Sequence, residues 1–402
     1  MKIKTGQGTI TIGILIAIYS ISMVTSLPGL AISPILGKLE SIFKDASDLQ
    51  LQMLESLPSF IIVPFILLAG RLSLRMNKKK LLVSGLGIFF ACSLVYPFLN
   101  GMGGLLFVSA LLGIGAGLVI PFSTGLVADY FTGSYRTRQL GYISAITNLT
   151  LVLATLLSGF LAGISWHLSF LVYCISGVSL FFSFYLDNKP VHNPTGTSPA
   201  EKTAAPAAKP RTLSLKVNWP VQLMIFYYII TFIVLTIPFN LALYMHDLKI
   251  GNYDTSGTLI SIFFLSMTAP GFFINQILTR LKNYTNTTSL SIITIGMLLF
   301  CFKGGIVPLT IGVILIGLGY GTMQPLIYDK TAATVEPTHA TYALSLVMAM
   351  NYIAIITYPF IIEWLGKLFS DNSSYFPYIF NMFIGLGFTV VAYLRRHHPT
   401  LG

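Results

Sequence analysis

Residues 113–121 read GIGAGLVIP, and residues 317–325 read GLGYGTMQP. Each stretch has glycine at three alternate positions, followed by a proline four residues after the last glycine. Small residues at regular spacing inside apolar sequence indicate helices that approach each other closely. Because the signature recurs about half a chain later, it predicts a structural unit that is present twice.

The composition defines the class of protein to which this unit belongs. Hydrophobic residues make up 54% of the chain, charged residues only 9%, and the mean hydropathy is +0.78. Soluble domains carry about 25% charged residues, so a soluble globule is excluded. Apolar runs close to the roughly 20 residues that cross a bilayer recur along the chain. Since hydrocarbon offers no water to backbone groups, these runs must be helices.

The sequence therefore predicts an all-α integral membrane protein with twelve transmembrane helices in two six-helix, pseudo-symmetric halves. The predicted spans are 10–32, 50–72, 80–99, 104–128, 139–163, 167–187, 220–245, 256–279, 285–302, 306–328, 340–362 and 376–394.

A polar segment separates the two sets of spans. Residues 188–218 are rich in Ala, Pro, Thr and Lys and contain no aromatic residue, so they cannot bury enough apolar surface to order themselves. We expect an N-terminal half over 1–187, a cytoplasmic linker over 188–219 and a C-terminal half over 220–402. Many secondary transporters consist of two such repeats that rock about a central site.

The positions of the basic residues predict the orientation. Most of the 24 Lys and Arg residues lie at the N-terminus, in the loops near 71–80 and 136–138, in the linker and at 395–396. All of these segments share one side in the twelve-span arrangement, and cytoplasmic loops are enriched in Lys and Arg. Both termini are thus expected in the cytoplasm of a bacterial cell, with the protein in its plasma membrane. The net charge of +11 then faces anionic lipid, and nucleic acid is not an expected partner.

The loop after the second span carries a family motif. Residues 70–80 read GRLSLRMNKKK, whereas the motif of the major facilitator superfamily is Gly-x-Leu-Ala-Asp-Arg-x-Gly-Arg-Lys. The matching positions are Gly70, Leu72, Arg75, Lys78 and Lys79. Leu74 replaces the usual Asp, and Asn77 replaces the second Gly. The chain resembles this superfamily over essentially its whole length, which implies a twelve-helix fold and transport by alternating access.

Two further stretches resemble the drug–proton antiporter branch of that superfamily. They are LLGIGAGLVIPFSTGLVADYF at 111–131 and SGFLAGISWHLSF at 158–170. Ser109 stands where this branch commonly has Arg, and Ala154-Thr155 stands where a Gly-Pro pair is expected. His167 occupies another position where Arg is common. The resemblance implies proton-driven export, although the departures weaken the match to the antiporters.

Three carboxylates are candidates for proton coupling. Glu55 lies inside the second span and shares a helix face with residues 59, 62 and 66, a face that lines the cavity in the resembled family. Ionisable groups inside a bilayer are costly and mark ion or substrate paths, but a solvated rim position is the alternative. Asp129 and Asp329 end spans four and ten beside basic residues, where they either latch an inner gate or mark the helix ends. Glu363, beside Trp364, is interpreted as interfacial.

Polar and aromatic residues inside the spans predict the substrate site. Such residues often only join helices, but together they are typical of a cavity for a moderately lipophilic ligand. The candidates are Tyr19, Gln52, Ser59, Asn148, Tyr227, Tyr228, Asn240, Gln324, Asn351 and Tyr352. Gating is expected from Gly70, Arg75, Gly113, Gly117, Pro121, Gly317, Gly321 and Pro325. Away from their ends, the spans hold no Lys or Arg for a strongly anionic substrate.

Other chemistries find no support in the sequence. No Gly-x-x-x-x-Gly-Lys-Ser/Thr loop is present for ATP, and no His or Cys pair has metal-site spacing. We expect no enzyme activity and no cofactor, with a proton gradient as the driving force. The expected partners are a small-molecule substrate, protons and the bilayer, and the expected state is a monomer. The alternative functions are an uptake permease or facilitator for a neutral polar solute, such as a sugar or nucleoside, and a non-transporting receptor or lipid flippase.

Overall fold

The protein is described by a computed structural model, and its described part is helical apart from an N-terminal hairpin and connecting turns. The described residues are 2–28, 30–35, 38–39, 42–44, 48–186, 218–250, 253–302, 305–369 and 373–396. Nearly all of the predicted linker over 188–219 lies outside them. The helix α9 (Asn218–Val234) already begins within the last two linker positions.

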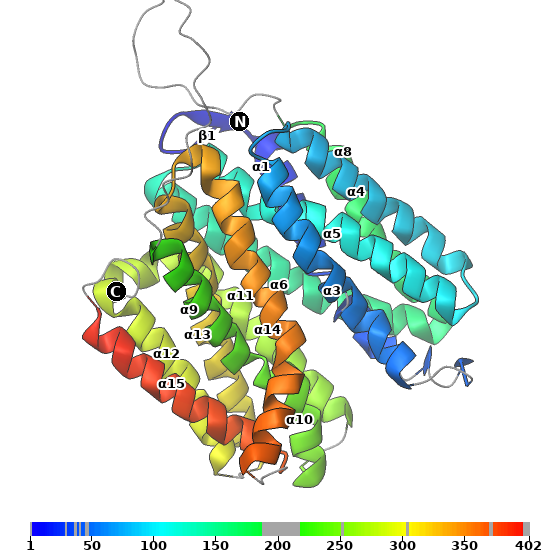
Figure 1. Ribbon diagram of the computed structural model, residues 1–402, viewed down its shortest axis with the longest axis vertical. Helices are drawn as coiled ribbons and strands as arrows, with labels where there is room; N and C mark the ends of the chain where they lie inside the picture. The colour runs from blue at the N-terminus through cyan, green and yellow to red at the C-terminus, as the bar shows by residue number, and fades with distance from the viewer. Residues whose placement is uncertain are drawn as a thin grey trace, which may run out of the picture.

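The helices gather in two lobes that follow each other along the chain (Figure 1). The N-terminal lobe contains α1 (Ile12–Thr25), η1 (Leu30–Ile35), α3 (Asp48–Leu72), α4 (Lys78–Val95), η2 (Tyr96–Phe98), α5 (Met102–Tyr130), α6 (Gly133–Ile164), α7 (Trp166–Ser169), η3 (Phe170–Cys174) and α8 (Ile175–Ser183). The C-terminal lobe contains α9, α10 (Thr236–Asp247), α11 (Tyr253–Leu281), η4 (Lys282–Tyr284), α12 (Thr285–Cys301), α13 (Ile306–Ala333), η5 (Pro337–His339), α14 (Ala340–Phe369) and α15 (Phe376–Leu394).

These helices account for the predicted membrane spans. Nine stretches of the described chain are long and apolar enough to cross a bilayer, and the stretch Thr255–Cys301 contains both α11 and α12. Two shorter apolar helices, Ile12–Thr25 and Ser56–Leu72, lie in the N-terminal lobe. All of these segments fall on the twelve predicted spans, and the predicted all-α membrane fold is confirmed.

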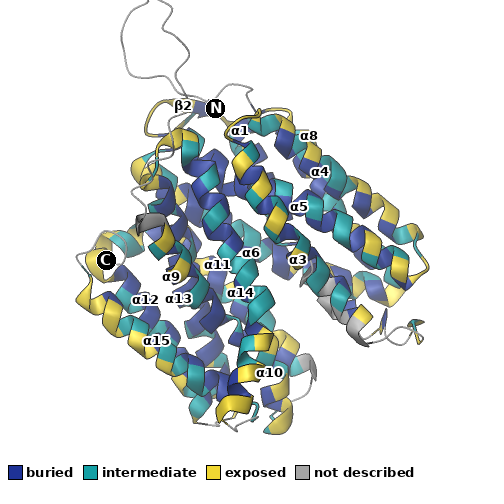
Figure 2. Cartoon of the chain, in the orientation of Figure 1, coloured by how far each residue is buried: buried dark blue, intermediate teal, exposed yellow. Residues whose placement is uncertain are grey.

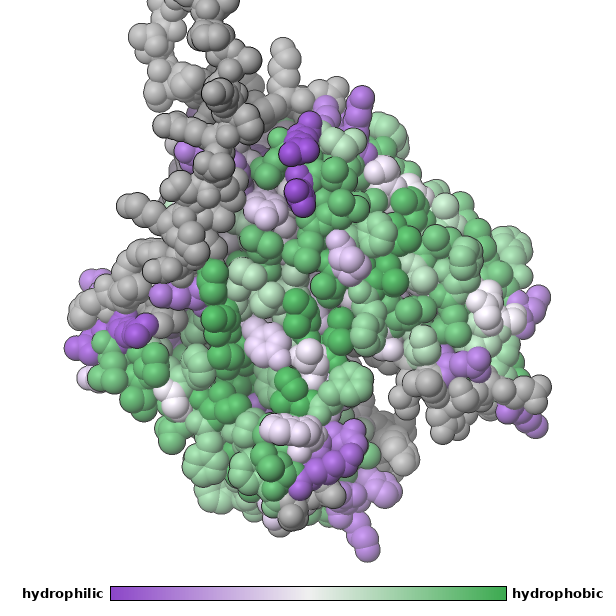
Figure 3. Space-filling view, in the orientation of Figure 1, coloured by the Kyte–Doolittle hydropathy of each residue, from purple (hydrophilic) through white to green (hydrophobic). Residues whose placement is uncertain are grey.

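The outer surface of the lobes is apolar, as a lipid-facing surface must be. Large side chains such as Phe107, Phe160 and Leu394 are exposed, whereas buried residues gather where the helices face one another (Figure 2). In the space-filling view, hydrophobic surface covers the middle of the molecule and hydrophilic residues lie mainly towards its ends (Figure 3). A patch of this size would cause aggregation in water, so it indicates contact with lipid.

The repeated glycine signature packs α5 against two neighbours in its own lobe. A Cβ atom added to Gly113 would lie 2.9 Å from the Pro58 carbonyl oxygen of α3. One added to Gly117 would lie 2.6 Å from the Phe65 Cβ of the same helix. Gly115, which points to the other side, would place its Cβ 2.8 Å from the Phe89 nitrogen of α4. Successive glycines of the signature therefore pack against different helices: Gly113 and Gly117 against α3, and Gly115 against α4.

The same arrangement recurs around α13. A Cβ on Gly317 would lie 2.7 Å from the Phe263 carbonyl oxygen of α11, and one on Gly321 would overlap the Met267 carbonyl group. Gly319 faces α12 instead, with 2.7 Å to the Ser289 carbonyl oxygen. Pro121 and Pro325 lie inside the continuous helices α5 and α13 and are buried. The signature is therefore a packing device between helices of one lobe, present in both lobes.

Contacts between the lobes lie near the end of the bundle that carries the basic loops. The helices α3 and α14 meet there, as do α6 and α11. A Cβ on Gly70 would overlap the Ser345 side chain, and one on Gly141 would lie 2.5 Å from the Gly271 carbonyl oxygen. In α14, buried residues are concentrated between 340 and 349, while most residues from 359 to 364 are partly or fully exposed. The lobes are therefore closely packed at the basic end, and the surface between them is indented at the opposite end (Figure 3).

The first helix is shorter than its predicted span of 10–32. The strands β1 (Lys2–Lys4) and β2 (Thr9–Thr11) form an antiparallel hairpin, and α1 begins only at Ile12. Gly6 allows the turn because it adopts a φ of 89°, in the left-handed region that glycine enters readily. The backbone nitrogen of Thr132 donates to the Thr5 carbonyl oxygen at 3.0 Å. This contact holds the hairpin against the α5–α6 connection.

Candidate substrate site and gate

A group of hydrogen-bonded tyrosines fills the centre of the C-terminal lobe. Tyr320, Gln324 and Tyr328 of α13 are spaced by four residues and so share one helix face. The hydroxyl groups of Tyr227, in α9, and Tyr328 are 2.7 Å apart, and Tyr320 donates to the Tyr227 oxygen at 3.4 Å. The Gln324 Nε2 donates to the oxygens of Tyr227 and Tyr328 at 3.2 and 3.4 Å.

Two further polar side chains extend this group. The Tyr320 hydroxyl also lies 3.3 Å from the Oδ1 of Asn351, in α14, and 3.2 Å from the Thr231 hydroxyl of α9. We call these six residues the tyrosine cluster; they are Tyr227, Thr231, Tyr320, Gln324, Tyr328 and Asn351. The prediction included Tyr227, Gln324 and Asn351 but missed the other three. The spacing of four residues around Gln324 was the signal that would have identified Tyr320 and Tyr328.

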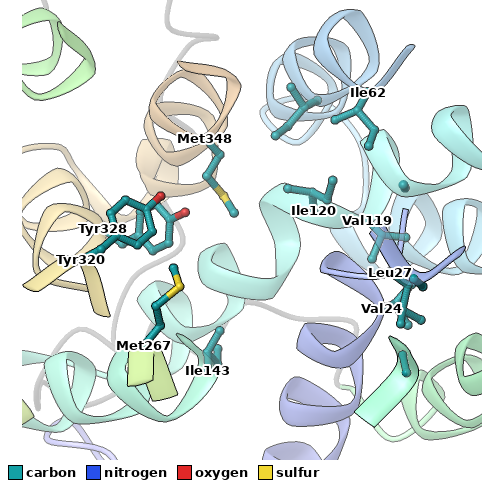
Figure 4. Close-up of a cluster of buried hydrophobic side chains, with 14 of the residues drawn as sticks. Val24, Leu27, Ile62, Val119, Ile120, Ile143, Met267, Tyr320, Tyr328 and Met348 are labelled. Carbon is teal, nitrogen blue, oxygen red and sulfur yellow. The ribbon is translucent and has the colours of Figure 1, made fainter. Parts of the chain in front are cut away.

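The tyrosine cluster lies beside buried apolar side chains at the centre of the molecule, where the two lobes face each other. Figure 4 shows Tyr320, Tyr328, Met348 and Met267 around this region, with Ile120 and Ile143 on the helices that face them. The Thr124 hydroxyl of α5 donates to the Met348 sulfur at 3.3 Å, so the two lobes also touch here. Flexible thioethers beside aromatic rings adapt to ligands of different shape.

The N-terminal lobe contributes fewer polar groups to the centre. Ser144 of α6 is buried and donates to the Gln324 Oε1 at 2.8 Å, which joins the lobes. Asn148, one turn further along α6, is 7% exposed, and its Nδ2 has no hydrogen-bond partner among the described residues. A buried donor without a partner is costly, and it is suited to a ligand or water. Tyr19 donates instead to Gln139 within its own lobe, and Ser59 is buried in α3.

The other predicted substrate residues do not join the tyrosine cluster. The Tyr228 hydroxyl lies 2.8 Å from that of Thr357, which ties α9 to α14. The Asn240 Nδ2 donates to the Tyr358 oxygen at 2.7 Å, which ties α10 to α14. Tyr352 is partly buried against the core. The contacts of Tyr228 and Asn240 join helices of a single lobe.

An ion pair closes the basic end between the lobes. The Arg136 Nε of α6 donates to the Asp329 Oδ1 of α13 at 2.6 Å, and the Thr137 hydroxyl donates to Oδ2 at 2.6 Å. The side chains of Arg136 and Asp329 are 15% and 17% exposed. We call Arg136, Thr137 and Asp329 the basic-end gate. Because water is largely excluded, this pair is stronger than a surface ion pair.

Asp129 forms an ion pair within one lobe. The Lys78 Nζ donates to both carboxylate oxygens of Asp129, at 2.8 and 2.7 Å, and joins α4 to the end of α5. The neighbouring Lys79 donates to the carbonyl oxygen of Leu186, just after α8, at 2.6 Å. Arg75 is exposed. The basic family motif therefore fastens helices of the N-terminal lobe, while the Asp329 contact spans both lobes.

The remaining carboxylates lie away from the tyrosine cluster or outside the description. The side chains of Glu55 and Gln52 are outside the described part of the structure, although both residues belong to α3. Glu363 is exposed and pairs with Lys367 at 2.6 Å. Asp247 and Glu336 are also exposed. Among the side chains that the structure describes, the tyrosine cluster contains no charged group.

Comparisons with known proteins agree with this architecture. The chain is 28% identical over 190 residues to the Quinolone resistance protein NorA of Staphylococcus aureus (strain MSSA476), which is 47% of this chain and 44% of NorA. It is 29% identical over 171 residues to the Multidrug transporter protein MdtP of Bacillus subtilis (strain 168), which is 42% of this chain and 30% of MdtP. The matches thus span less than half the length of these curated relatives.

Solved structures share the fold. The human organic anion transporter MFSD10 (TETRAN) has a TM-score of 0.71 at 12% identity, covering 93% of this chain and 98% of MFSD10. The proton:xylose symporter XylE also has a TM-score of 0.71 at 12% identity, covering 94% and 95% of the two chains. Residues 10–332 match the Major Facilitator Superfamily. With most of its length matched and its helices arranged in two lobes, this chain belongs to the Major Facilitator Superfamily of membrane transporters.

Proposed function

We propose that this transporter exports lipophilic small molecules by alternating access, driven by protons. The observation that carries the proposal is the uncharged centre between the lobes, where hydrogen-bonded tyrosines lie beside methionines and other apolar side chains. Such walls bind ligands mainly through apolar contact, with a few hydrogen bonds to fix orientation. The similarity to proteins named for quinolone resistance and multidrug transport supports the same substrate class.

The substrate site in this proposal combines both lobes. The tyrosine cluster supplies hydroxyl and amide groups, Met267 and Met348 supply adaptable surface, and Asn148 supplies the buried amide donor. Tyr19, Gln52, Ser59 and Tyr352 remain candidate lining residues of the same site. Tyr228 and Asn240 take a supporting role, since each is already engaged with a neighbouring helix.

Proton coupling is assigned to Glu55, with Asp129 and Asp329 as the alternatives. Asp129 and Asp329 are each held by a cation at the basic end. Taking up a proton at either residue would break an ion pair, which links protonation to the conformation of that end. Glu55 lies in α3 towards the opposite end, where the lobes are further apart. Only a group whose proton affinity differs between the two states can drive the change.

The proposal includes the orientation in the membrane. We place the basic end in the cytoplasm, with both termini and the linker over 188–219, because Lys and Arg concentrate there. The protein then acts as a monomer in the plasma membrane, with halves over 1–187 and 220–402. In this orientation the basic-end gate is the inner gate, and the indented end faces outwards.

An uptake permease or facilitator for a neutral polar solute is the second candidate. The buried amide of Asn148 and the partly buried amides of Gln324 and Asn351 favour it, because sugars and nucleosides are recognised through several hydrogen bonds. Of the three, Asn148 is the one whose amide nitrogen is fully buried without a partner in the described structure. The tyrosine cluster satisfies most of its own hydrogen bonds, and this favours a lipophilic substrate.

Dye transport in inverted membrane vesicles tests the proposal. Inverted vesicles with and without the protein are energised with an acidic interior, and the lipophilic dye Hoechst 33342 is added to the outer medium. We expect the protein-containing vesicles to take up dye faster, and this excess to disappear when the proton gradient is collapsed. Cells that express the protein should also tolerate more of a quinolone. Uptake of radiolabelled sugar or nucleoside into intact cells, without dye transport, would establish the permease instead.

A further inference from the structure

Gln324 connects the tyrosine cluster with the opposite lobe. Within its own lobe, its Nε2 donates to the hydroxyl oxygens of Tyr227 and Tyr328. Across the interface, its Oε1 accepts the Ser144 hydroxyl at 2.8 Å. Ser144 is 4% exposed, while Gln324 is only partly buried. Both ends of this amide are therefore engaged, one in each lobe.

The basic-end gate also joins α6 and α13, at a second position along both helices. Thr137 and Ser144 lie seven residues apart on α6, about two turns or 10 Å along one helix face. Asp329, which accepts from Thr137 and Arg136, follows Gln324 by five residues on α13. Because each helix is continuous between its two contacts, separation of the lobes at the gate also pulls Ser144 away from Gln324.

We propose that Gln324 is a positioning residue that makes closure of the basic-end gate depend on the arrangement of the tyrosine cluster. The oxygen and nitrogen of an amide are fixed relative to each other, so the bond from Ser144 sets the direction of Nε2. A molecule that binds the Tyr227 or Tyr328 hydroxyl turns the amide and weakens the bond to α6. Ligand binding then favours opening of the gate.

The inference deepens the proposed function, on which it rests for the identity of the ligand. The link between cluster and gate, however, is a property of the ligand-free protein. It can therefore be measured without any substrate, and its failure can be distinguished from the failure of the proposed function.

The measurement is the ratio of gate-open to gate-closed protein in lipid nanodiscs. Cys92, Cys174 and Cys301 are replaced first, and spin-label pairs are then introduced at exposed positions. Met76 and Glu336 report on the basic end, and Ile164 and Phe369 report on the opposite end. Distance distributions between the labels give the populations of the two states.

The first comparison removes the hydrogen bond between Ser144 and Gln324. Ser144→Ala should raise the gate-open ratio about two- to tenfold, the effect of losing one hydrogen bond. Thr147→Val is the matched control, because it also removes a hydroxyl from α6, three residues away. Thr147 donates to the Ser22 carbonyl oxygen of its own lobe at 3.1 Å, and its loss should leave the ratio unchanged.

The second comparison perturbs the cluster without touching α6. Tyr328→Phe removes one acceptor of the Gln324 amide and should also raise the gate-open ratio at least about twofold. This effect should vanish in a Gln324→Met background, where the connection is already broken. Tyr358→Phe is the control: Tyr358 is a buried tyrosine of the same lobe whose hydroxyl contacts Asn240 and Thr236.

The outcomes distinguish the inference about Gln324 from the proposed export function. Equal shifts from Ser144→Ala and Thr147→Val would show that α6 is merely loosened. A Tyr328→Phe effect that persists in the Gln324→Met background would show that Gln324 is not the link. Either result, or no shift from Ser144→Ala, overturns the inference and leaves the proposed function standing. The expected shifts in a protein that exports no dye would instead contradict the proposed function.

Discussion

At the scale of single residues, the two aspartates at the basic end have different partners. Asp129 is bound by Lys78 inside the N-terminal lobe, whereas Asp329 is bound by Arg136 and Thr137 from the opposite lobe. The contact of Asp329 must therefore break when the lobes separate at this end, while that of Asp129 can persist. We therefore expect a charge change at Asp329 to act directly on the gate.

Neutralising Asp329 is expected to open the gate. Asp329→Asn leaves the partly buried Arg136 without a counter-ion, at a cost of roughly 1–3 kcal/mol to the closed state. A cysteine placed near the gate should then react faster with a membrane-impermeant maleimide added from the cytoplasmic side of inverted vesicles. Glu363→Gln is the control, because Glu363 pairs with Lys367 on an exposed surface. Unchanged reactivity in Asp329→Asn would show that the ion pair does not hold the gate.

Glu55 provides the residue-scale test of coupling. Glu55→Gln keeps the size and most hydrogen bonding of the side chain but removes its titration. We expect loss of uphill dye transport driven by a pH gradient, with downhill exchange of bound dye retained. Both rates are measured in vesicles, and Glu336→Gln, at an exposed carboxylate, serves as control. Parent-like pumping by Glu55→Gln would move the coupling role to Asp129 or Asp329, or indicate a facilitator without a proton cycle.

At the scale of the helices, the alternate glycines determine how closely neighbours pack. Gly113 and Gly117 place α5 against α3, and Gly317 and Gly321 place α13 against α11. All four helices also make contacts between the lobes. The helices α3 and α5 pack against α14, and α11 and α13 pack against α6. Close packing within each lobe allows the lobe to move as a rigid body, as alternating access requires.

Leucine at a packed glycine should abolish transport. Gly321→Leu forces a side chain against the Met267 carbonyl, and Gly117→Leu forces one against Phe65; overpacking of this kind typically costs about 1–3 kcal/mol or more. We expect both variants to reach the membrane without exporting dye, as shown by surface biotinylation and vesicle assays. Gly387→Leu and Gly87→Leu are the controls, because no atom lies within 4 Å of an added Cβ at either position. Normal transport by Gly117→Leu and Gly321→Leu would contradict the packing argument.

At the scale of the whole molecule, the lobes are packed at the basic end and indented at the other. The end with close contacts contains the Gly70–Ser345 and Gly141–Gly271 approaches and the basic-end gate. If this end faces the cytoplasm, the structure represents the outward-open state of the transport cycle. Which state of the transport cycle the structure represents thus depends on the orientation of the protein in the membrane.

Topology can be measured directly. Epitope tags inserted between residues 190 and 215, or placed after Gly402, should be protected from antibody in intact cells and exposed after permeabilisation. A tag near Asp371 should be accessible in both conditions. Antibody binding to the linker tag in intact cells would refute the twelve-span topology with a cytoplasmic basic end.

The sequence alone determined the fold class, the twelve spans and the spacing of the packed glycines. Hydropathy and helical periodicity are properties of neighbouring residues, so each span could be predicted from its own composition. The start of α1 was missed because a hairpin and a helix are both compatible with its β-branched residues, and contacts with the distant Thr132 favour the hairpin. The division at 188–219 remains a prediction.

Only the tertiary structure decided which polar residues act together. Tyr227 and Gln324 proved to share a cluster, while Tyr228 and Asn240 bond to other helices. Likewise, Ser144 meets Gln324 across the lobes. These contacts depend on the rotation and distance of helices far apart in the chain, and a pattern within one span carries no information about either. For the same reason, the sequence could not decide whether Asp129 and Asp329 latch a gate or mark helix ends, whereas packing pairs Asp329 with Arg136 of the other lobe and Asp129 with Lys78 of its own.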